Sequence, residues 1–397
     1  MEPRPLDGVR VIDLTNVLAG PYCSYQLALF GAEVIKIEKP GSGDLARHLG
    51  PDPTLNEAGV GASFLAQNAG KKSVELDLKD PADRHRFEQL LTEADVLLEN
   101  FRAGVMARLG YDWETVHALN PRLIYCAITG FGQTGPMSQA PAYDQIVQGL
   151  SGMMSITGTA TTAPLRIGFP VCDTVGGLMA ALAVCAALTD REQTGGRFLD
   201  VSMLEASLSA MGWAVSNYQV SGVETVAMGD QNATAAPSGT FRAADGPLNI
   251  AANRQTQYES LCRIIGRLDL IDDQRFATRE LRKQHRFALN DELNQALAAR
   301  KASVWADLLT RAGVPAAPIL TVAQAVETPQ LAHRDFFYDV PFPGDPGRTV
   351  RTSSNGAHID GVALHPVTGP PLLGEHNSEL LDDPADSAAD AVLSAEG

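Results

Sequence analysis

Residues 15–21 have the position, but not the composition, of a cofactor-binding loop. The loop lies between a predicted strand and a predicted helix, and Glu38 closes the next predicted strand. A dinucleotide site needs G-x-G-x-x-G at this turn, so that the pyrophosphate can approach the helix N-terminus. The loop reads Thr-Asn-Val-Leu-Ala-Gly-Pro instead. The sequence therefore disfavours a nicotinamide cofactor.

Other local motifs of catalysis are also missing from the sequence. It contains no P-loop, no G-x-S-x-G elbow, no H-E-x-x-H and no clustered histidines. The five cysteines are an odd number without C-x-x-C spacing, and most stand in apolar runs: Cys23, Cys126, Cys172, Cys185 and Cys262. We expect buried free thiols, with neither a disulfide framework nor a metal site.

The first half of the chain alternates strand and helix signals. Short β-rich runs at 9–14 and 32–37 flank a helical stretch, Ala19 to Phe30, which ends at Gly31. Further strands are predicted at 73–78, 95–99 and 123–129, with a helix from Asp80 to about Glu93. This alternation predicts an α/β fold with a Rossmann-like, doubly wound large domain.

The second half has a different texture. We predict a strand at 168–173, an alanine-rich helix at 175–190, and a long helix from Val201 to Val220 that is apolar around nearly its whole circumference and buried between domains. A smaller α+β domain follows. The predicted organisation is 1–200 for the large domain, 201–222 for a linker helix, 223–322 for the small domain, and 323–397 for a return to the large domain with an acidic tail.

Composition restricts the partners and the compartment. The 397 residues are 45% hydrophobic and carry a formal net charge of −16, which argues against nucleic acid or an anionic membrane as a partner. The tail from Glu375 onward contains no Lys or Arg. The longest apolar helical run, 177–188, is shorter than the roughly 20 residues of a membrane span. We therefore expect a soluble, cytoplasmic protein.

Six ordered segments together carry a resemblance to a known family. They are Leu6–Leu14, Leu18–Pro21, Gly31–Pro40, Glu99 through Arg108, Gly313–Pro318 and Leu373–His376. The chain resembles the family III coenzyme A transferases, which include formyl-CoA and carnitine-CoA transferases. For the fold, the resemblance implies an interlinked homodimer. For the activity, it implies acyl-CoA and carboxylic acid substrates, with CoA thioester as a substrate and no separate cofactor.

The resemblance makes Asp173 the catalytic nucleophile. Its carboxylate would attack the acyl-CoA thioester, and the reaction would pass through an aspartyl anhydride and an aspartyl-CoA thioester. Without the resemblance, an Asp before an alanine-rich helix is read as a helix N-cap, and both roles are compatible because N–H groups at a helix start would hold the carboxylate ionised. Gly176-Gly177 are candidates for close backbone approach, and Met228-Gly229-Asp230 for a lid.

The resemblance also implies a set of CoA-binding residues. They are Val17, Leu18, Ala19, Lys39, Leu76, Asn100, Phe101, Arg108 and Tyr143, with Tyr143 near the thioester and Leu18 at the acyl pocket. Lys39 and Arg108 suit the phosphates of CoA, because both are cationic. Lys71 and Lys72 are weaker candidates for the same cationic patch.

Three functions remain open from the sequence. Leu18 stands where formyl-CoA transferase has a glutamine, which disfavours formate and makes the acyl pocket more apolar at that wall. Family members that act on succinyl-type or aromatic acids also have leucine there, so the resemblance implies a small dicarboxylic acid of the itaconate, mesaconate, malate or succinate type as acceptor, with succinyl-CoA as a possible donor. A 2-methylacyl-CoA racemase needs a second base, and Tyr143 is a poor one. A non-catalytic acyl-CoA-binding paralogue is the third alternative, which Asp173 argues against.

Overall fold

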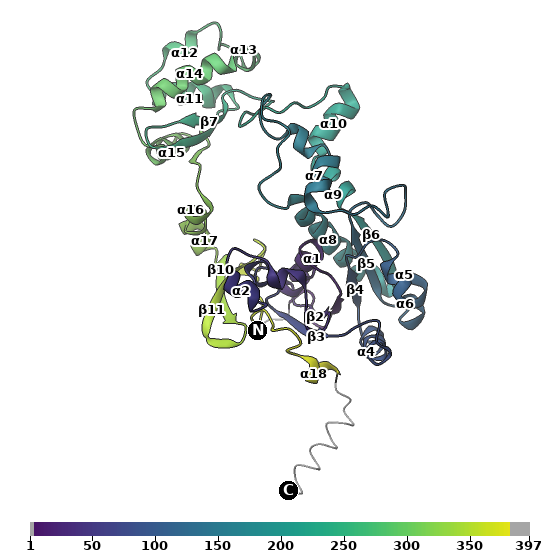
Figure 1. Ribbon diagram of the computed structural model, residues 1–397. Helices are drawn as coiled ribbons and strands as arrows, with labels where there is room; N and C mark the ends of the chain where they lie inside the picture. Colours follow the sequence, from purple (N-terminus) through teal and green to yellow (C-terminus); the bar gives the residue numbers. More distant parts are fainter. Residues whose placement is uncertain (1–3, 382–397) are drawn as a thin grey trace. The chain divides into compact units, whose positions relative to one another are not determined.

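A parallel six-stranded sheet forms the centre of the first part of the chain. The computed structural model describes residues 4–381, and the sheet order is β3-β2-β1-β4-β5-β6 (Figure 1). Its strands are β1 Arg10–Asp13, β2 Glu33–Glu38, β3 Lys71–Glu75, β4 Val96–Glu99, β5 Ile124–Thr129 and β6 Arg197–Ser202. All neighbours in the sheet are parallel. This order is that of a doubly wound sheet, so the predicted α/β fold is confirmed.

Helices cover both faces of this sheet. Strand residues alternate between the faces, so that Val11 packs toward helices α1 (Ala19–Leu29) and α8 (Val171–Thr194), whereas Ile12 packs toward α4 (Pro81–Thr92). The helices α5 (Val105–Leu109) and α6 (Trp113–Leu119) lie on the α4 side (Figure 1). The central strands β4 and β5 are buried on both faces, which explains why they are apolar over most of their length.

The strand order reverses direction beside β1. The chain moves from β1 outward to β3, returns, and continues from β4 on the other side. In parallel sheets of this kind, ligands bind outside the carboxyl ends of the strands at such a switch point. The residues at that point are those that follow β1 and β4, namely 14–18 and 100–103.

Shorter elements complete the first part of the chain. They are the 3₁₀ helix η1 (Leu45–His48), α2 (Pro53–Glu57), α3 (Ala62–Leu65), α7 (Asp144–Leu150) and the 3₁₀ helix η2 (Met153–Ile156). Tyr143 is the residue that precedes α7.

The helix that carries Asp173 is longer than expected. The prediction of a strand at 168–173 is wrong, because α8 begins at Val171, directly after Pro170, and continues to Thr194. Its length and hydropathy would suffice for a membrane span, but it packs against α1, α9, β5 and β6. It is therefore a core helix of the first part of the chain.

The predicted single helix at 201–222 is also wrong. Val201 and Ser202 belong to β6, where they pair with β5, and the Ser202 side chain caps α9 (Met203–Ala210). Met211 separates α9 from α10 (Gly212–Ser221). The segment is apolar on all sides, which predicts one buried helix. The strand pairing of its first two residues and the cap at Ser202 instead divide it into a strand end and two helices. Within the described chain, α10 has no buried residue.

The chain forms two compact units. The described residues within Met1–Met153, Arg166–Val223 and Pro329–Gly397 make the first, and Met154–Leu165 with Glu224–Thr328 make the second. The second has an antiparallel sheet of β7 (Ser238–Arg242), β8 (Pro247–Ala251) and β9 (Ala316–Pro318). Its helices are α11 Gln255–Ile264, α12 Asp269–Asp272, α13 Arg279–Gln284, α14 Arg286–Leu297, α15 Ala302–Arg311 and α16 Val322–Val326.

The C-terminal segment belongs to the first unit. It contains α17 (Pro329–His333), the hairpin β10 (Phe337–Phe342) and β11 (Asp345–Ser353), the short pair β12 (His358–Ile359) and β13 (Val362–Ala363), and α18 (Asn377–Leu381). His376 donates its backbone N–H to the carbonyl of Ser73 beside the main sheet. Most of the predicted acidic tail lies outside the described residues.

Candidate active site

A cavity of about 230 Å³ lies at the switch point of the large sheet. It is bordered by the loops after β1 and β4, the end of β5, the residue before α7 and the first turn of α8. The lining residues are Asn16, Val17, Leu18, Ala19, Asn100, Phe101, Arg102, Ile128, Thr129, Gly130, Phe131, Ser138, Ala140, Ala142, Tyr143, Asp173 and Met203. The structure thus brings seven of the ten predicted site residues together, although they span more than 150 positions of the chain.

Three predicted CoA-binding residues lie outside this lining. Lys39 and Arg108 are exposed, and Leu76 is buried in the apolar core. Exposed cations can contact CoA phosphates that face the solvent, but neither Lys39 nor Arg108 lines the cavity. Their roles therefore stay predictions. Lys71 and Lys72 do not form a cationic patch, because each is engaged elsewhere: the Lys71 ammonium is buried beside Asp13, and that of Lys72 pairs with Glu33 and Glu379.

Asp173 is not the cap of its helix. Pro170 is the N-cap residue of α8, and Asp173 is the third residue of the first turn. The capping carboxylate belongs to Asp144, whose Oδ1 accepts the backbone N–H of Cys172 at 2.8 Å and lies 3.5 Å from that of Asp173. The cap reading was wrong because Asp144, which precedes it by 29 positions, already satisfies these donors. The carboxylate of Asp173 is therefore not needed to cap α8, and Asp173 lines the cavity.

Two side chains hold the carboxylate of Asp144. The other oxygen, Oδ2, accepts from the Gln148 amide at 2.7 Å and from Arg166 at 3.3 Å. Asp144 is buried, whereas Arg166 is more exposed. This arrangement fixes a second carboxylate directly behind the first turn of α8.

The electrostatic environment of Asp173 differs from the expected one. Burial, and then the negative charge of Asp144, raise the pKa of Asp173 to about 7, while Arg166 acts in the opposite direction. The expectation that helix N–H groups hold the carboxylate ionised is therefore not met. At neutral pH the ionised and protonated forms are both populated. A raised pKa in a cavity is typical of a functional carboxyl group, and the ionised form is a stronger nucleophile when it is poorly solvated.

Close packing of two helices sets the distance between Asp173 and the β1 loop. A Cβ atom at Gly177 of α8 would overlap with the carbonyl oxygen of Ala19 at the start of α1. A Cβ atom at Gly176 would come within 2.8 Å of the Met203 side chain. The approach of the α1 backbone therefore requires glycine at position 177. A close approach of Gly176 and Gly177 to the substrate stays a prediction.

The β1 and β4 loops are tied to each other by a reciprocal pair of hydrogen bonds. The Asn100 side chain accepts the backbone N–H of Asn16 at 2.8 Å and donates to the Asn16 carbonyl, also at 2.8 Å. Below Asn100, the buried Glu99 accepts the N–H of Phe101. Burial raises the pKa of Glu99 to about 8, so this carboxyl group is largely neutral at pH 7. These contacts hold Asn100 and Phe101 at the cavity.

Sequence reasoning missed Asp144 and Arg102. Asp144 follows Tyr143 directly, and its i,i+4 partner Gln148 was visible in the sequence, but its role as the cap of α8 depends on the tertiary fold. Arg102 follows Phe101 and is the cation among the described lining residues of the cavity. Its side chain forms no ion pair within residues 4–381.

The predicted lid residues lie in the second unit. Met228, Gly229 and Asp230 line a separate cavity of about 980 Å³ together with Thr159, Arg242 and neighbouring residues. A role of this loop as a lid stays a prediction.

The cysteines are free thiols. Cys23, Cys126, Cys172 and Cys262 are buried, and Cys185 is partly buried. Burial raises the pKa of each thiol, which keeps these groups protonated. Within residues 4–381, no group of three His, Cys, Asp or Glu side chains gathers in a way that could hold a metal ion.

Comparison with known proteins agrees with this geometry. The profile of CoA-transferase family III matches residues 6–377. The chain is 41% identical to acetyl-CoA:oxalate CoA-transferase of Acetobacter aceti over 86% of this chain and 88% of that protein, and 35% identical to succinyl-CoA:glutarate CoA-transferase of Mus musculus over 96% and 86%. The crystal structure of a CAIB/BAIF family protein from Brucella suis superposes with a TM-score of 0.85 at 34% identity, covering 96% of this chain and 99% of that one. The chain is an enzyme that belongs to CoA-transferase family III.

Proposed function

We propose that this enzyme transfers CoA from an acyl-CoA donor to a small dicarboxylic acid, and that Asp173 is the nucleophile. One observation supports this most strongly: a carboxyl group with a raised pKa lies in the same cavity as the loops after β1 and β4, which the family resemblance assigns to CoA. Neither Glu99 nor Asp144 lines this cavity. Asp173 is therefore the carboxylate that can reach a bound thioester.

The proposed chemistry needs only carboxylates and a thiolate. The ionised Asp173 attacks the thioester carbonyl, the C–S bond breaks, and CoA thiolate leaves an aspartyl–acyl anhydride. The thiolate then attacks the aspartyl carbonyl, releases the first acid as its carboxylate, and forms an aspartyl-CoA thioester. The acceptor carboxylate attacks this thioester to give a second anhydride and thiolate. Attack of the thiolate on the acceptor carbonyl yields the new acyl-CoA and restores Asp173.

A dicarboxylic acceptor fits the lining of the cavity. Leu18, Phe131 and Met203 give apolar walls, and Arg102 supplies a guanidinium for a second carboxylate. The relatives named above act on oxalate and glutarate, which are dicarboxylates. Succinyl-CoA is the donor that we propose.

The racemase alternative has no observation in its favour. A racemase requires two bases on opposite sides of the α-carbon. The residue at the second position is Tyr143, whose side chain is 72% exposed. We therefore do not propose α-proton exchange.

A product assay tests the proposed function. The enzyme is incubated with succinyl-CoA and a panel of acids that includes glutarate, mesaconate, oxalate, butyrate and formate, and new CoA esters are detected by mass spectrometry. We expect new esters of dicarboxylates, with little product from butyrate or formate. Absence of any new ester, with CoA binding retained, would favour the non-catalytic paralogue.

A further inference from the structure

The wall of the cavity contains a backbone conformation that valine rarely adopts. Val17 has a φ angle of +69°, in the left-handed region. For a β-branched residue this conformation is strained, and it persists only where the surroundings impose it. The strained residue lies in the middle of the lining segment Asn16–Ala19. Some contact must therefore hold the Val17 backbone in place.

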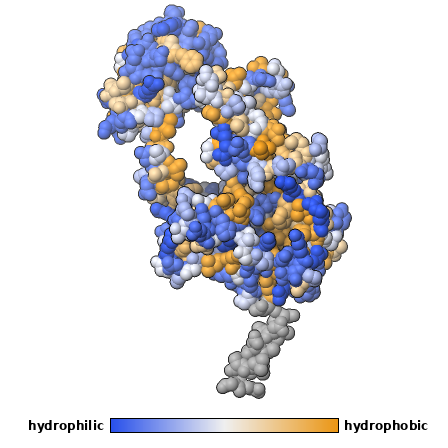
Figure 2. Space-filling view, viewed as in Figure 1, coloured by the Kyte–Doolittle hydropathy of each residue, from blue (hydrophilic) through white to orange (hydrophobic). Residues whose placement is uncertain are grey.

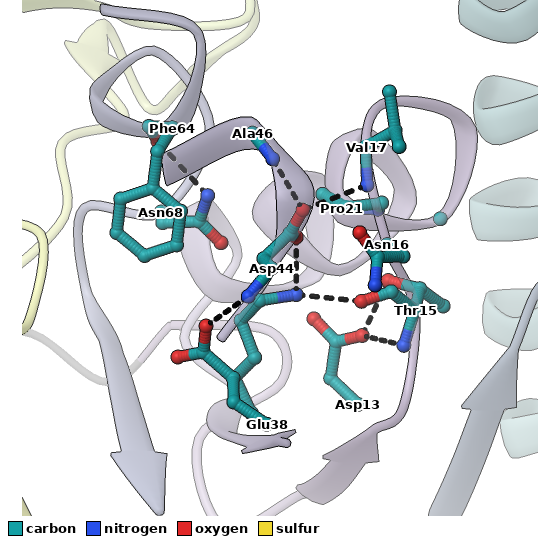
Figure 3. Close-up of polar contacts among 12 residues, drawn as sticks. Asp13, Thr15, Asn16, Val17, Pro21, Glu38, Asp44, Ala46, Phe64 and Asn68 are labelled. Atoms are coloured by element: carbon teal, nitrogen blue, oxygen red, sulfur yellow. Dashed lines mark hydrogen bonds and ion pairs between the residues drawn. The ribbon is translucent and has the colours of Figure 1, made fainter. Parts of the chain in front are cut away.

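The contact that holds Val17 comes from a buried carboxylate. Oδ1 of Asp44 accepts the backbone N–H of Val17 at 3.0 Å and that of Ala46 at 2.8 Å. Figure 3 shows Asp44 between these two N–H groups, with Val17 on the side of the β1 loop. Asp44 is only 1% exposed, so water does not replace this acceptor.

A buried lysine fixes the position of Asp44. The Lys36 ammonium lies 2.9 Å from Oδ2 of Asp44 and donates to the carbonyl oxygen of Thr15 at 2.7 Å. Lys36 comes from β2, so one ammonium connects the sheet, the carboxylate and the residue two positions before Val17. Lys36 therefore binds the loop at the Thr15 carbonyl, and Asp44 binds it at the Val17 N–H.

The surroundings of Asp44 and Lys36 favour the ionised form of both side chains. Burial acts to raise the pKa of Asp44, but Lys36 and the backbone N–H groups of Ala46 and Val17 together lower it below its usual value. Burial acts to lower the pKa of Lys36, but Asp44, Asp13 and Glu38 together raise it above its usual value. Both groups are therefore ionised across the working pH range, and the hydrogen bond to Val17 is charge-assisted.

We propose that Asp44 and Lys36 are positioning residues, which impose the left-handed conformation of Val17 and thereby shape the CoA-binding wall of the cavity. This inference rests on the proposed function, because it assumes that the wall contacts CoA. Neither side chain lines the cavity, so both act through the backbone of residues 15–17. When the Asp44 acceptor is lost, Val17 relaxes toward negative φ, and the lining residues that follow it, Leu18 and Ala19, change position.

Two substitutions at one position separate the acceptor from the charge. Asp44→Asn and Asp44→Ala both remove the carboxylate that lies 2.9 Å from the Lys36 ammonium, but only Asn retains an oxygen that can accept the N–H of Val17. We expect Asp44→Ala to weaken the binding of free CoA about tenfold, measured by isothermal titration calorimetry. The substitution removes the hydrogen bond to the Val17 N–H, and with it the contact that maintains the positive φ of Val17. Asp44→Asn should stay within about threefold of the wild type.

A second substitution tests whether Val17 is the link. Glycine adopts positive φ without the Cβ penalty, so Asp44→Ala should cost less CoA affinity in the Val17→Gly background than in the wild type. If Asp44→Ala does not fold, the same comparison is made in Lys36→Met/Asp44→Ala, which buries no unpaired charge. Equal losses for Ala and Asn at position 44, without recovery by Val17→Gly, would overturn the inference.

Arg282 provides a control. It is also fully buried, and it donates to the carbonyl oxygens of Ala236 and Phe276 and to the Gln255 side chain, all within the second unit. Arg282→Gln should lower the melting temperature and leave CoA affinity unchanged. An equal loss of affinity in this control would mean that general destabilisation explains the effect. Failure of the wild-type protein to bind CoA would instead overturn the proposed function, which distinguishes the two failures.

Discussion

At the scale of single residues, the site is defined by two carboxylates with different tasks. Asp144 is engaged by backbone N–H groups, Gln148 and Arg166, and it holds the start of α8. Asp173 has no hydrogen bond to its carboxylate within the described residues and opens to the cavity. Burial, and then the charge of the Asp144 carboxylate, raise the pKa of Asp173. The proposed nucleophile is therefore tuned by a neighbour that does not itself react.

This arrangement predicts a pH shift for Asp144→Asn. The amide oxygen of Asn can still accept the Cys172 N–H, so the cap is retained, but the negative charge that raises the pKa of Asp173 is gone. Because Asp173 must be ionised to react, the acidic limb of kcat/KM should move to lower pH. Arg166, which then lacks its ion-pair partner Asp144, also lowers the pKa of Asp173. A limb that stays in place, in a folded variant, would contradict this coupling.

Arg102 allows a test of acceptor recognition. Arg102→Gln should raise the KM for glutarate about tenfold or more and leave butyrate nearly unaffected, because a charge-assisted bond to the second carboxylate is lost. Arg108→Gln is the contrasting variant, since Arg108 is exposed outside the cavity and is predicted to contact CoA phosphates. It should raise the KM for the acyl-CoA instead. The placement of Arg102 is wrong if its replacement affects both acids equally.

At the scale of secondary structure, local patterns predicted the sheet but not the site. Alternating strand and helix signals over residues 9–129 were sufficient to predict a doubly wound sheet, because each βαβ unit is built from neighbouring segments, but they gave neither the strand order nor β6. The segment Val201–Val220 was misread, since apolar content alone does not distinguish a strand end and two helices from one helix.

The cap of α8 shows why the rest could not be read from the sequence. The acceptor for its first N–H groups comes from α7, which precedes it by more than twenty residues. The strained Val17 has no sequence signature either, because its acceptor, Asp44, is 27 positions away. Such contacts depend on tertiary structure. The family resemblance, by contrast, predicted that Asp173, Leu18 and Asn100 belong to one site, and all three line the same cavity.

Helix packing predicts the effect of adding one methyl group to α8. Gly177→Ala places a Cβ atom against the backbone of Ala19, which cannot move aside as a flexible side chain can. We expect a loss of about 1–3 kcal/mol in the free energy of unfolding, together with weaker CoA binding, because α1 and the β1 loop must shift. The matched control is Gly212→Ala at the start of α10, where no heavy atom lies within 4 Å. It should change stability by no more than about 0.5 kcal/mol.

Denaturant unfolding and calorimetric CoA titration of both glycine variants check this prediction. Equal stability of Gly177→Ala and Gly212→Ala would show that α1 and α8 do not need their close approach.

At the scale of the whole molecule, α10 exposes an unusual amount of apolar surface. Trp213 is 86% exposed and Val220 is 85% exposed, and α10 has no buried residue within the described chain. Figure 2 shows orange hydrophobic areas between blue hydrophilic ones on the visible face. Large exposed apolar side chains on one helix are typical of a protein contact. We propose that the contact is with a second copy of the chain, in the interlinked homodimer that the family resemblance implies.

An interlinked homodimer predicts very slow subunit exchange. Interlinked chains must unfold before they separate, so tagged and untagged native dimers should remain unmixed for hours, and dilution should not yield monomers. Native mass spectrometry of the mixture measures this directly. Mixed dimers within minutes would contradict interlinking, and a monomer at all concentrations would contradict the dimer itself.

The central claim, that Asp173 is the nucleophile, is tested most directly by trapping its thioester. Wild-type enzyme is incubated with acyl-CoA without acceptor, digested, and analysed by peptide mass spectrometry. We predict CoA in thioester linkage on the peptide that contains Asp173, released by hydroxylamine. The Asp173→Asn variant should remain folded and carry no CoA, because an amide cannot form the anhydride. CoA on another residue, or full transfer activity in Asp173→Asn after deamidation is excluded, would contradict the account.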